Sequence, residues 1–335
     1  MTDTIIVGGG HNGLVCAAYL ARAGKKVTVL EAADQAGGAA ITREFAPGFR
    51  VSTCAHLLYV LDEGIRKELE LNSHGLRMAK EGMTTIALDT NGAHISIYGA
   101  SVEGSGVSDA DKAAMADYHQ SMSRFATIIG RLSAQVPPRL GTTAPGDLLT
   151  LARLGWNIRK LGRDDMREFL RIAGINVYDI LQEKFDNELL KGALSLDGVM
   201  GTFLGTRSNN SVFCALHRLS QGGGYSQPEG GMGSVSNAIA DAARKYGAHI
   251  RLSSPVKKIL LDSGSVVGVK LEGGEQLSAT TVVSSADPKT TFNQLLGAQN
   301  LEAGFAHRIR NIRSKGQVAK LHLAVSALPD FTVLD

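Results

Sequence analysis

The chain has 335 residues, of which 44% are hydrophobic, and a formal net charge of +3 at pH 7. This length can bury a large core and suggests two domains. The small net charge argues against nucleic acid as a partner. Cys16, Cys54 and Cys214 are widely spaced and form no C-x-x-C pair, which argues against a disulfide framework, a zinc site and a redox dithiol. We therefore expect a protein of the reducing, cytoplasmic compartment.

A strand–helix–strand pattern opens the chain. Residues 4–7 form a short apolar run, residues 12–23 have a helical pattern that Gly24 ends, and residues 27–30 form a second apolar run. Strand, helix and strand within about 30 residues are what a nucleotide-binding βαβ unit requires. The first apolar run is too short for a signal peptide or a membrane span.

The middle of the chain is predicted to be helical, and strands return after it. Helical patterns cover 108–134 and 146–192, and the second is broken near Gly162 and Gly174. After two glycine clusters, we expect a helix over 234–246, strands at 250–252, 256–261 and 281–284, and a β-meander over 256–279.

Gly8-Gly9-Gly10-His11-Asn12-Gly13 contains the pattern G-x-G-x-x-G. Gly8 permits a tight turn out of the strand, Gly10 lets the backbone approach a pyrophosphate, and Gly13 allows close helix–strand packing. The backbone N–H groups of His11 and Asn12 open the helix and offer a partial positive charge to phosphates. The hexapeptide alone is a weak signal, but it lies between a strand and a helix, which is the context that the fingerprint needs.

Glu31 ends the second apolar run and is followed by Ala32. A carboxylate at this place can accept hydrogen bonds from both ribose hydroxyls of an adenosine, and it disfavours NADP because it repels a 2′-phosphate. The alternative is a surface glutamate after an ordinary glycine turn. The register of strand, glycines, helix, strand and acid favours the ribose-binding interpretation.

A second glycine pair, Gly37-Gly38, is followed by Ala39-Ala40-Ile41-Thr42. With this pair, residues 5–42 resemble the extended FAD fingerprint of the amine-oxidase and phytoene-desaturase superfamily. Residues 47–59, 230–233 and 283–288 resemble later motifs of its phytoene desaturase-like and carotenoid isomerase-like branch.

That resemblance implies FAD as the cofactor. It places Gly37, Gly38, Ala39 and Ala40 near the pyrophosphate and the flavin. It further implies that Val256 contacts the adenine through its backbone and that Ala286 lies near the nucleotide. Many relatives carry arginine at the position of Ala39, so backbone donors are expected to neutralise more of the phosphate charge here.

The fold implied is α/β: a three-layer, Rossmann-like FAD/NAD(P)-binding domain over residues 1–100 and 221–295, with a mixed α+β substrate domain over 101–220 and 296–335. The function implied is that of an FAD-dependent oxidoreductase, phytoene dehydrogenase-like, that removes hydride from or isomerises an apolar small molecule. A flavin amine oxidase and a non-catalytic interaction protein that keeps the nucleotide fold are the alternatives. The family's C-terminal glycine-rich segment is expected beyond residue 335, so we expect a partial chain. No catalytic residue or metal site is assigned.

One helical region has two interpretations. It combines basic and apolar side chains: Arg153, Arg159, Lys160, Arg163, Leu151, Leu154, Trp156, Ile158 and Leu161. Such a pattern is typical of a surface that touches anionic lipid, which would make the protein peripheral to a membrane. A solvated helix face is the more common explanation of such a pattern.

Overall fold

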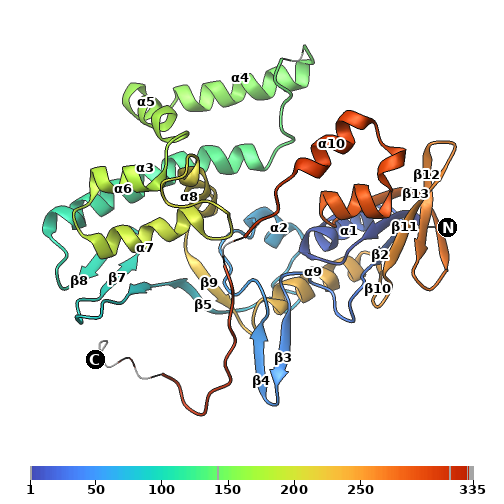
Figure 1. Ribbon diagram of the computed structural model, residues 1–335, viewed down its shortest axis with the longest axis horizontal. Coiled ribbons are helices and arrows are strands. Elements are labelled where there is room, and N and C mark those ends of the chain that lie inside the picture. The colour runs from blue at the N-terminus through green and yellow to red at the C-terminus, as the bar shows by residue number, and fades with distance from the viewer. Residues whose placement is uncertain (1, 142, 317, 330, 332–335) are drawn as a thin grey trace. The chain divides into compact units, whose positions relative to one another are not determined.

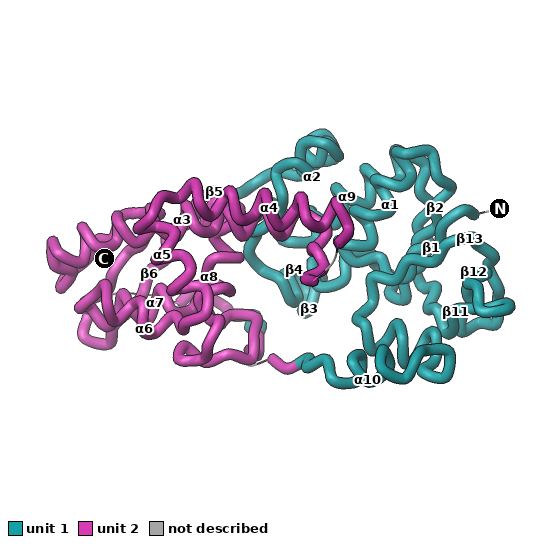
Figure 2. The backbone as a smooth tube through the Cα atoms, turned by 90° about the horizontal axis from the view of Figure 1, so that it is seen from above, with its two compact units in different colours: residues 1–80, 227–314, 322–324 teal, residues 81–226, 315–321, 325–335 magenta. Residues whose placement is uncertain are grey.

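The computed structural model describes residues 2–141, 143–316, 318–329 and 331. The chain divides into two compact units (Figure 2). The first comprises Met1–Lys80, Gln227–Ser314 and His322–Ala324; the second comprises Glu81–Ser226, Lys315–Leu321 and Val325–Asp335. The sequence pattern places these boundaries near residues 100 and 295 instead. Residues 81–100 group with the second unit because Ile95 and Ile97 are buried among its helices.

A six-stranded sheet organises the first unit (Figure 1), in the order β10-β2-β1-β13-β12-β11. Its central strand β1 pairs in parallel with β2 on one side and with β13 on the other. The predicted βαβ unit is present, with helix α1 between β1 and β2. The strands are β1 (Thr2–Val7), β2 (Val27–Leu30), β10 (His249–Arg251), β11 (Val256–Asp262), β12 (Ser265–Leu271) and β13 (Gln276–Ser284); α1 spans His11–Arg22.

Strand β13 takes part in two kinds of pairing. Its first residues, from Gln276 to Ser278, run antiparallel to β12, and its remainder, from Ala279 to Ser284, runs parallel to β1. The sequence predicts a meander that ends at 279 and a separate strand at 281–284. The structure joins them because no breaker interrupts the run and β-branched residues fill it.

The two faces of the sheet carry separate cores, since alternate side chains of a strand point to opposite faces. Ile6 is buried in a cluster with α1 and α9 (Gly233–Lys245), which pack against each other. Ile5 and Val7 are buried in a second cluster with β11, β12 and Leu295. Helices, sheet and meander therefore form three layers, and the predicted α/β Rossmann-like fold is confirmed.

Shorter elements complete the first unit. They are the hairpin β3 (Thr42–Ala46) and β4 (Phe49–Ser52), helices α2 (Glu63–Glu68) and α10 (Ala303–Asn311), the π-helix η1 (Thr290–Leu295) and the 3-10 helix η2 (Ala298–Asn300). Strands β5 (Met78–Met83) and β9 (Tyr225–Pro228) form a two-stranded sheet, and each contains a point where the chain passes from one unit to the other.

In the described part of the chain, the second unit contains a small antiparallel sheet and six helices. The strands are β6 (Thr85–Ala87), β7 (Ile95–Tyr98) and β8 (Ser101–Gly104); the helices are α3 (Asp109–Ser133), α4 (Pro145–Arg159), α5 (Arg163–Ile172), α6 (Val177–Lys184), α7 (Glu188–Val199) and α8 (Ser211–Leu219). Gly162 and Gly174 separate helices as predicted, and Gly162 precedes α5 with a φ of +88°. Among the described residues, no helix is long and apolar enough to cross a bilayer.

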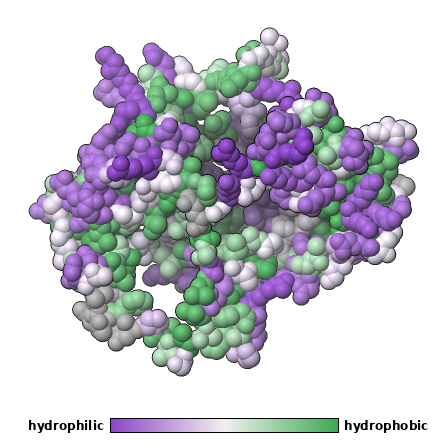
Figure 3. Space-filling model, in the orientation of Figure 1, coloured by the Kyte–Doolittle hydropathy of each residue, from purple (hydrophilic) through white to green (hydrophobic). Residues whose placement is uncertain are grey.

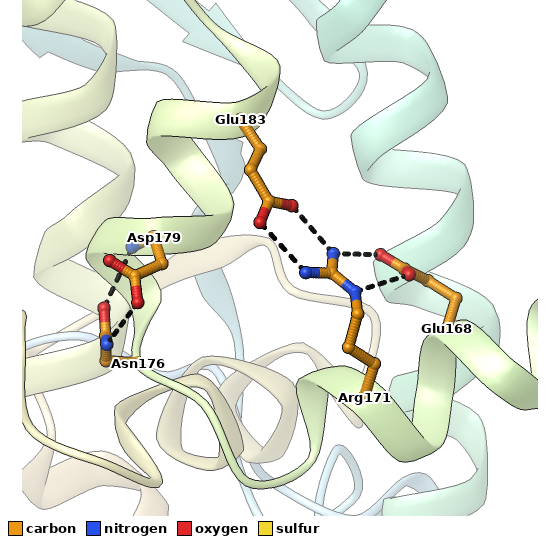
Figure 4. Close-up of polar contacts among 5 residues, drawn as sticks. All are labelled: Glu168, Arg171, Asn176, Asp179 and Glu183. Atoms are coloured by element: carbon orange, nitrogen blue, oxygen red, sulfur yellow. Dashed lines mark hydrogen bonds and ion pairs between the residues drawn. The ribbon is translucent and has the colours of Figure 1, made fainter.

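Arg171 connects α5 to α6 (Figure 4). Its guanidinium donates hydrogen bonds to Glu168 within α5 and to Glu183 on α6, at 2.7 to 3.0 Å. The hydrogen bonds from Arg171 lower the pKa of Glu168. Because these side chains are partly solvated, the network adds modestly to stability.

The carboxylate of Asp111 anchors the start of α3. It is 4% exposed and accepts hydrogen bonds from the Ser108 hydroxyl (3.0 Å) and the Asp186 backbone N–H (2.9 Å). Burial raises the pKa of this carboxyl, but the hydrogen bonds from Asp186, Ser108 and the backbone of Asn187 together lower it below its usual value.

Asp111→Asn is expected to lower the free energy of unfolding by about 1–3 kcal/mol at neutral pH, because the hydrogen bonds from Ser108, Asp186 and Asn187 lose their charged acceptor. The folded-state pKa is depressed, so this contribution is complete above the unfolded-state pKa and is lost as the pH falls through the folded-state value. Urea unfolding at neutral and acid pH measures this contribution to the free energy of unfolding. Asp109→Asn, an exposed position in the same turn, is the control, and an equal loss in both variants would contradict the assignment.

Candidate dinucleotide site

The glycine loop between β1 and α1 turns as tightly as the sequence predicts. Gly8 has a φ of +95°, and its N–H donates to the carbonyl of Leu30 at 2.8 Å. A Cβ on Gly13 would lie 2.2 Å from the Gly8 carbonyl oxygen. The first and third glycines of the motif are therefore required by the protein's own packing.

Gly10 differs from Gly9 and Gly13 because its Cβ position is not occupied by other protein atoms. A Cβ built on it would meet only the Gly38 Cα, at 3.8 Å, which is an ordinary contact. Gly10 is the N-cap of α1, and the helix has no side-chain cap and no acid in its first turn. The free N–H groups and positive end of the dipole at this terminus suit an anion such as a pyrophosphate.

The second glycine pair lies against the first loop. The Gly37 N–H donates to the Gly9 carbonyl at 2.8 Å, and Gly10 forms a parallel bridge with Gly37. Gly38 has a φ of +59°, and a Cβ there would come within 3.0 Å of the Gly10 Cα. Gly37 and Gly38 therefore border the space beside Gly10 with backbone atoms alone.

Glu31 connects the end of β2 to the same loop. One carboxylate oxygen accepts the Gly9 N–H at 2.6 Å, and the other accepts the Ala33 N–H at 2.9 Å. The sequence predicts that this carboxylate accepts the ribose hydroxyls, and the structure adds a role in holding the loop. Each carboxylate oxygen has a second lone pair, so both functions are compatible.

The later sequence motifs come to the same edge of the sheet. Ser285 follows β13, and its hydroxyl donates to the Gly8 carbonyl at 3.1 Å, which places Ala286 beside the turn. The N–H of Ser254 donates to the Glu31 carbonyl at 2.8 Å, and Val256 begins β11 two residues later. Ala286 and Val256 thus lie on segments that border the glycine loop and Glu31, respectively.

The remaining predicted residues differ in what they can offer a ligand. His11, Asn12, Ala32 and Ala39 are exposed, so they are accessible. Ala40 is buried, its N–H donates to Gly37 and its carbonyl accepts the Ser236 hydroxyl. Ala40 therefore packs the loop onto α9.

Sequence reasoning missed the residues that join the second glycine pair to α9. The Thr42 hydroxyl donates to the Gly230 carbonyl and accepts the Gly233 N–H, both at 3.0 Å. The Ser52 hydroxyl accepts the Met232 N–H at 3.0 Å. The sequence identified Thr42 only as the last residue of the second glycine motif, because its hydrogen-bond partners lie 188 and 191 residues away along the chain.

No group of acids, histidines and cysteines in the described ranges could hold a metal ion. Asp287, directly after the Ala286 segment, accepts hydrogen bonds from the hydroxyl and N–H of Thr290. The hydrogen bond from the Thr290 hydroxyl lowers the pKa of Asp287 most. The bonds from the backbone N–H groups of Thr290 and Lys289 lower it further. This carboxylate therefore shapes the turn into η1.

These features define a dinucleotide-binding protein of the Rossmann type. Comparison with protein-family models agrees: residues 6–66 match an NAD(P)-binding Rossmann-like domain, and residues 165–329 match the flavin-containing amine oxidoreductase family. The chain therefore combines an FAD/NAD(P)-binding Rossmann-like domain with a region that matches the flavin-containing amine oxidoreductase family.

Several curated relatives support this assignment. Pyridine nucleotide-disulfide oxidoreductase domain-containing protein 2 of Rattus norvegicus is 32% identical over 98% of the chain and 61% of its own length. One of the subunits of limonene dehydrogenase from Castellaniella defragrans is 26% identical over 90% of the chain and 54% of its own length. Prolycopene isomerase of Arabidopsis thaliana is 37% identical over 27% of the chain and 14% of its own length, so the carotenoid isomerase branch is among the relatives.

An oxidoreductase from Methanosarcina mazei shares the fold, with a TM-score of 0.57, 18% identity, and coverage of 93% of the chain and 66% of that structure. The chain spans about three fifths of the length of the rat relative.

Proposed function

We propose that the chain is the dinucleotide-binding part of an FAD-dependent oxidoreductase that takes hydride from, or isomerises, an apolar substrate. The observation that carries the proposal is the open space beside Gly10, bordered by the α1 N-terminus, the backbone of Gly38 and the loop that Glu31 holds. A side chain would fill this space, so the residues present fit a dinucleotide.

The protein's own groups would bind and orient the cofactor. The N–H groups at the start of α1 would hold the pyrophosphate, and Glu31 would hold the ribose hydroxyls. Gly37 and Gly38 let the backbone come close on the other side. When bound, FAD supplies a two-electron acceptor, and the protein supplies position and desolvation.

Support for an apolar substrate comes from the relatives. Two of them are named for limonene dehydrogenation and prolycopene isomerisation, and both of those compounds are hydrocarbons. The amine-oxidase alternative is supported by the family model that matches residues 165–329. The two reactions differ in the substrate group that is oxidised, so one assay separates them.

The assay follows the visible band of oxidised flavin after anaerobic mixing of FAD-loaded protein with a polyene in micelles or with a primary amine. We expect bleaching by the polyene, or its isomerisation without net bleaching, and no reaction with the amine. The Gly10→Val protein provides the background. Bleaching by the amine alone would replace the proposal with an amine oxidase. Failure to load FAD at all would favour a non-catalytic interaction protein.

A further inference from the structure

Helix α4 is apolar on two opposite sides, and packing explains only one of them. Leu154 and Ile158, with Leu161 just after the helix, pack against the core of the second unit. Leu148, Ala152 and Trp156 follow one another at four-residue intervals and therefore share another face. The outer face, defined as Leu148, Leu149, Ala152 and Trp156, is exposed to solvent.

The exposure of the outer face is large. Leu148 is 49% exposed, Leu149 50% and Trp156 60%, and no residue of α4 is fully buried. Figure 3 shows apolar surface over α4 at the top of the view. A solvated helix face carries polar side chains outward, whereas a helix that is apolar all round is covered by protein or lipid.

The charges on α4 and on Lys160 directly after it are mostly positive. Between residues 139 and 163 the chain has five basic side chains and a single carboxylate, Asp147, and two acids, Asp164 and Asp165, follow at the start of α5. Arg153, Arg159 and Lys160 are exposed on α4 or directly after it, and the Lys160 Nζ lies 5.7 Å from the Trp156 ring centroid. The sequence assigned Leu154 and Ile158 to the same surface, but the structure turns them to the core.

We infer that the outer face of α4 binds the surface of a bilayer that contains anionic lipid. Leucine and tryptophan would enter the boundary between head groups and acyl chains, while the arginines and Lys160 would contact the anionic head groups. Such a helix lies in the membrane surface and does not cross it. The inference concerns the second unit and is independent of flavin binding.

Trp156 is the only tryptophan of the chain, so its fluorescence reports on the outer face alone. The probes are vesicles of phosphatidylcholine, with or without phosphatidylserine, that carry brominated acyl chains. We expect a blue shift and quenching of Trp156 with the phosphatidylserine vesicles, weakened by salt because the charges are screened. Neutral vesicles should give little change.

Two double variants separate the contributions, and both keep the tryptophan. Leu148→Asn with Leu149→Asn should abolish quenching. Arg153→Gln with Lys160→Gln should weaken binding roughly fivefold for each side chain replaced. The matched control is Leu196→Asn, since Leu196 is also 50% exposed but lies on α7, and it should bind as the unaltered protein does. Thermal unfolding of each variant confirms that it is folded.

Three outcomes would overturn the inference. One is the absence of quenching with either kind of vesicle. Another is equal binding to neutral and anionic vesicles. The last is a shift of Trp156 fluorescence that grows with protein concentration in the absence of vesicles, which would identify a second copy of the chain as the occupant.

Discussion

Gly10→Val is expected to abolish dinucleotide binding while the protein stays folded. Gly10 has φ −68° and ψ 167°, an extended conformation that valine adopts readily, and a Cβ there makes only an ordinary contact. The side chain would instead occupy the space beside the α1 N-terminus that a pyrophosphate needs. We expect at least a 100-fold loss of affinity, or about 2.8 kcal/mol, measured by calorimetric titration with ADP and FAD.

Gly13→Ala is the matched control, because it places a methyl group at the other end of the same motif. That methyl group would lie 2.2 Å from the Gly8 carbonyl oxygen, so the loop must shift. We expect a loss of about 1–3 kcal/mol in the free energy of unfolding. If Gly10→Val lowers the melting temperature as much as Gly13→Ala, the space beside Gly10 is needed for packing. Unchanged affinity for ADP and FAD in a folded Gly10→Val protein would show that this space is not a ligand site.

Glu31→Gln is expected to weaken the binding of adenine dinucleotides by about 10- to 100-fold, because charge-assisted hydrogen bonds of this kind contribute about 1.5–3 kcal/mol each. Glu31 also binds the Gly9 N–H, so affinity alone does not separate ribose binding from loop anchoring. A thermodynamic cycle that combines this mutation with a change of ligand separates the two roles: the affinities of both proteins are measured for ADP and for 2′-deoxy-ADP.

The unaltered protein should bind ADP more tightly than 2′-deoxy-ADP, and Glu31→Gln should lose most of that preference. Asp34→Asn, an exposed carboxylate three residues away that pairs with Arg43, should keep it. A preference that survives in Glu31→Gln would mean that the carboxylate only supports the loop.

The sequence could predict the βαβ unit because its signals are local. Gly8, Gly10 and Gly13 lie close together in the sequence, between two apolar runs. Gly24 ends α1 with a φ of +81°, the left-handed conformation that is common for a glycine at a helix C-terminus. The same local signals located the breaks at Gly162 and Gly174. At each of these positions, the residue type and a few neighbouring residues are enough to predict the backbone conformation.

Long-range contacts could not be predicted in the same way. The Gly9–Glu31 hydrogen bond, the Thr42 contacts with Gly230 and Gly233, and the Ser285 contact with Gly8 join segments that only the fold brings together. The orientation of α4 also depends on tertiary packing. Leucines occur on both of its sides, so periodicity alone does not show which side meets the core.

The measurement that tests the central claim most directly is a competition titration of the purified chain with FAD, FMN and ADP. If the N-terminal βαβ unit holds the ADP half of the cofactor, FAD binds saturably, ADP displaces it, and FMN, which lacks that half, binds far more weakly. Binding of FMN as tight as that of FAD, with no displacement by ADP, would show that the glycine loop and Glu31 are not the cofactor site.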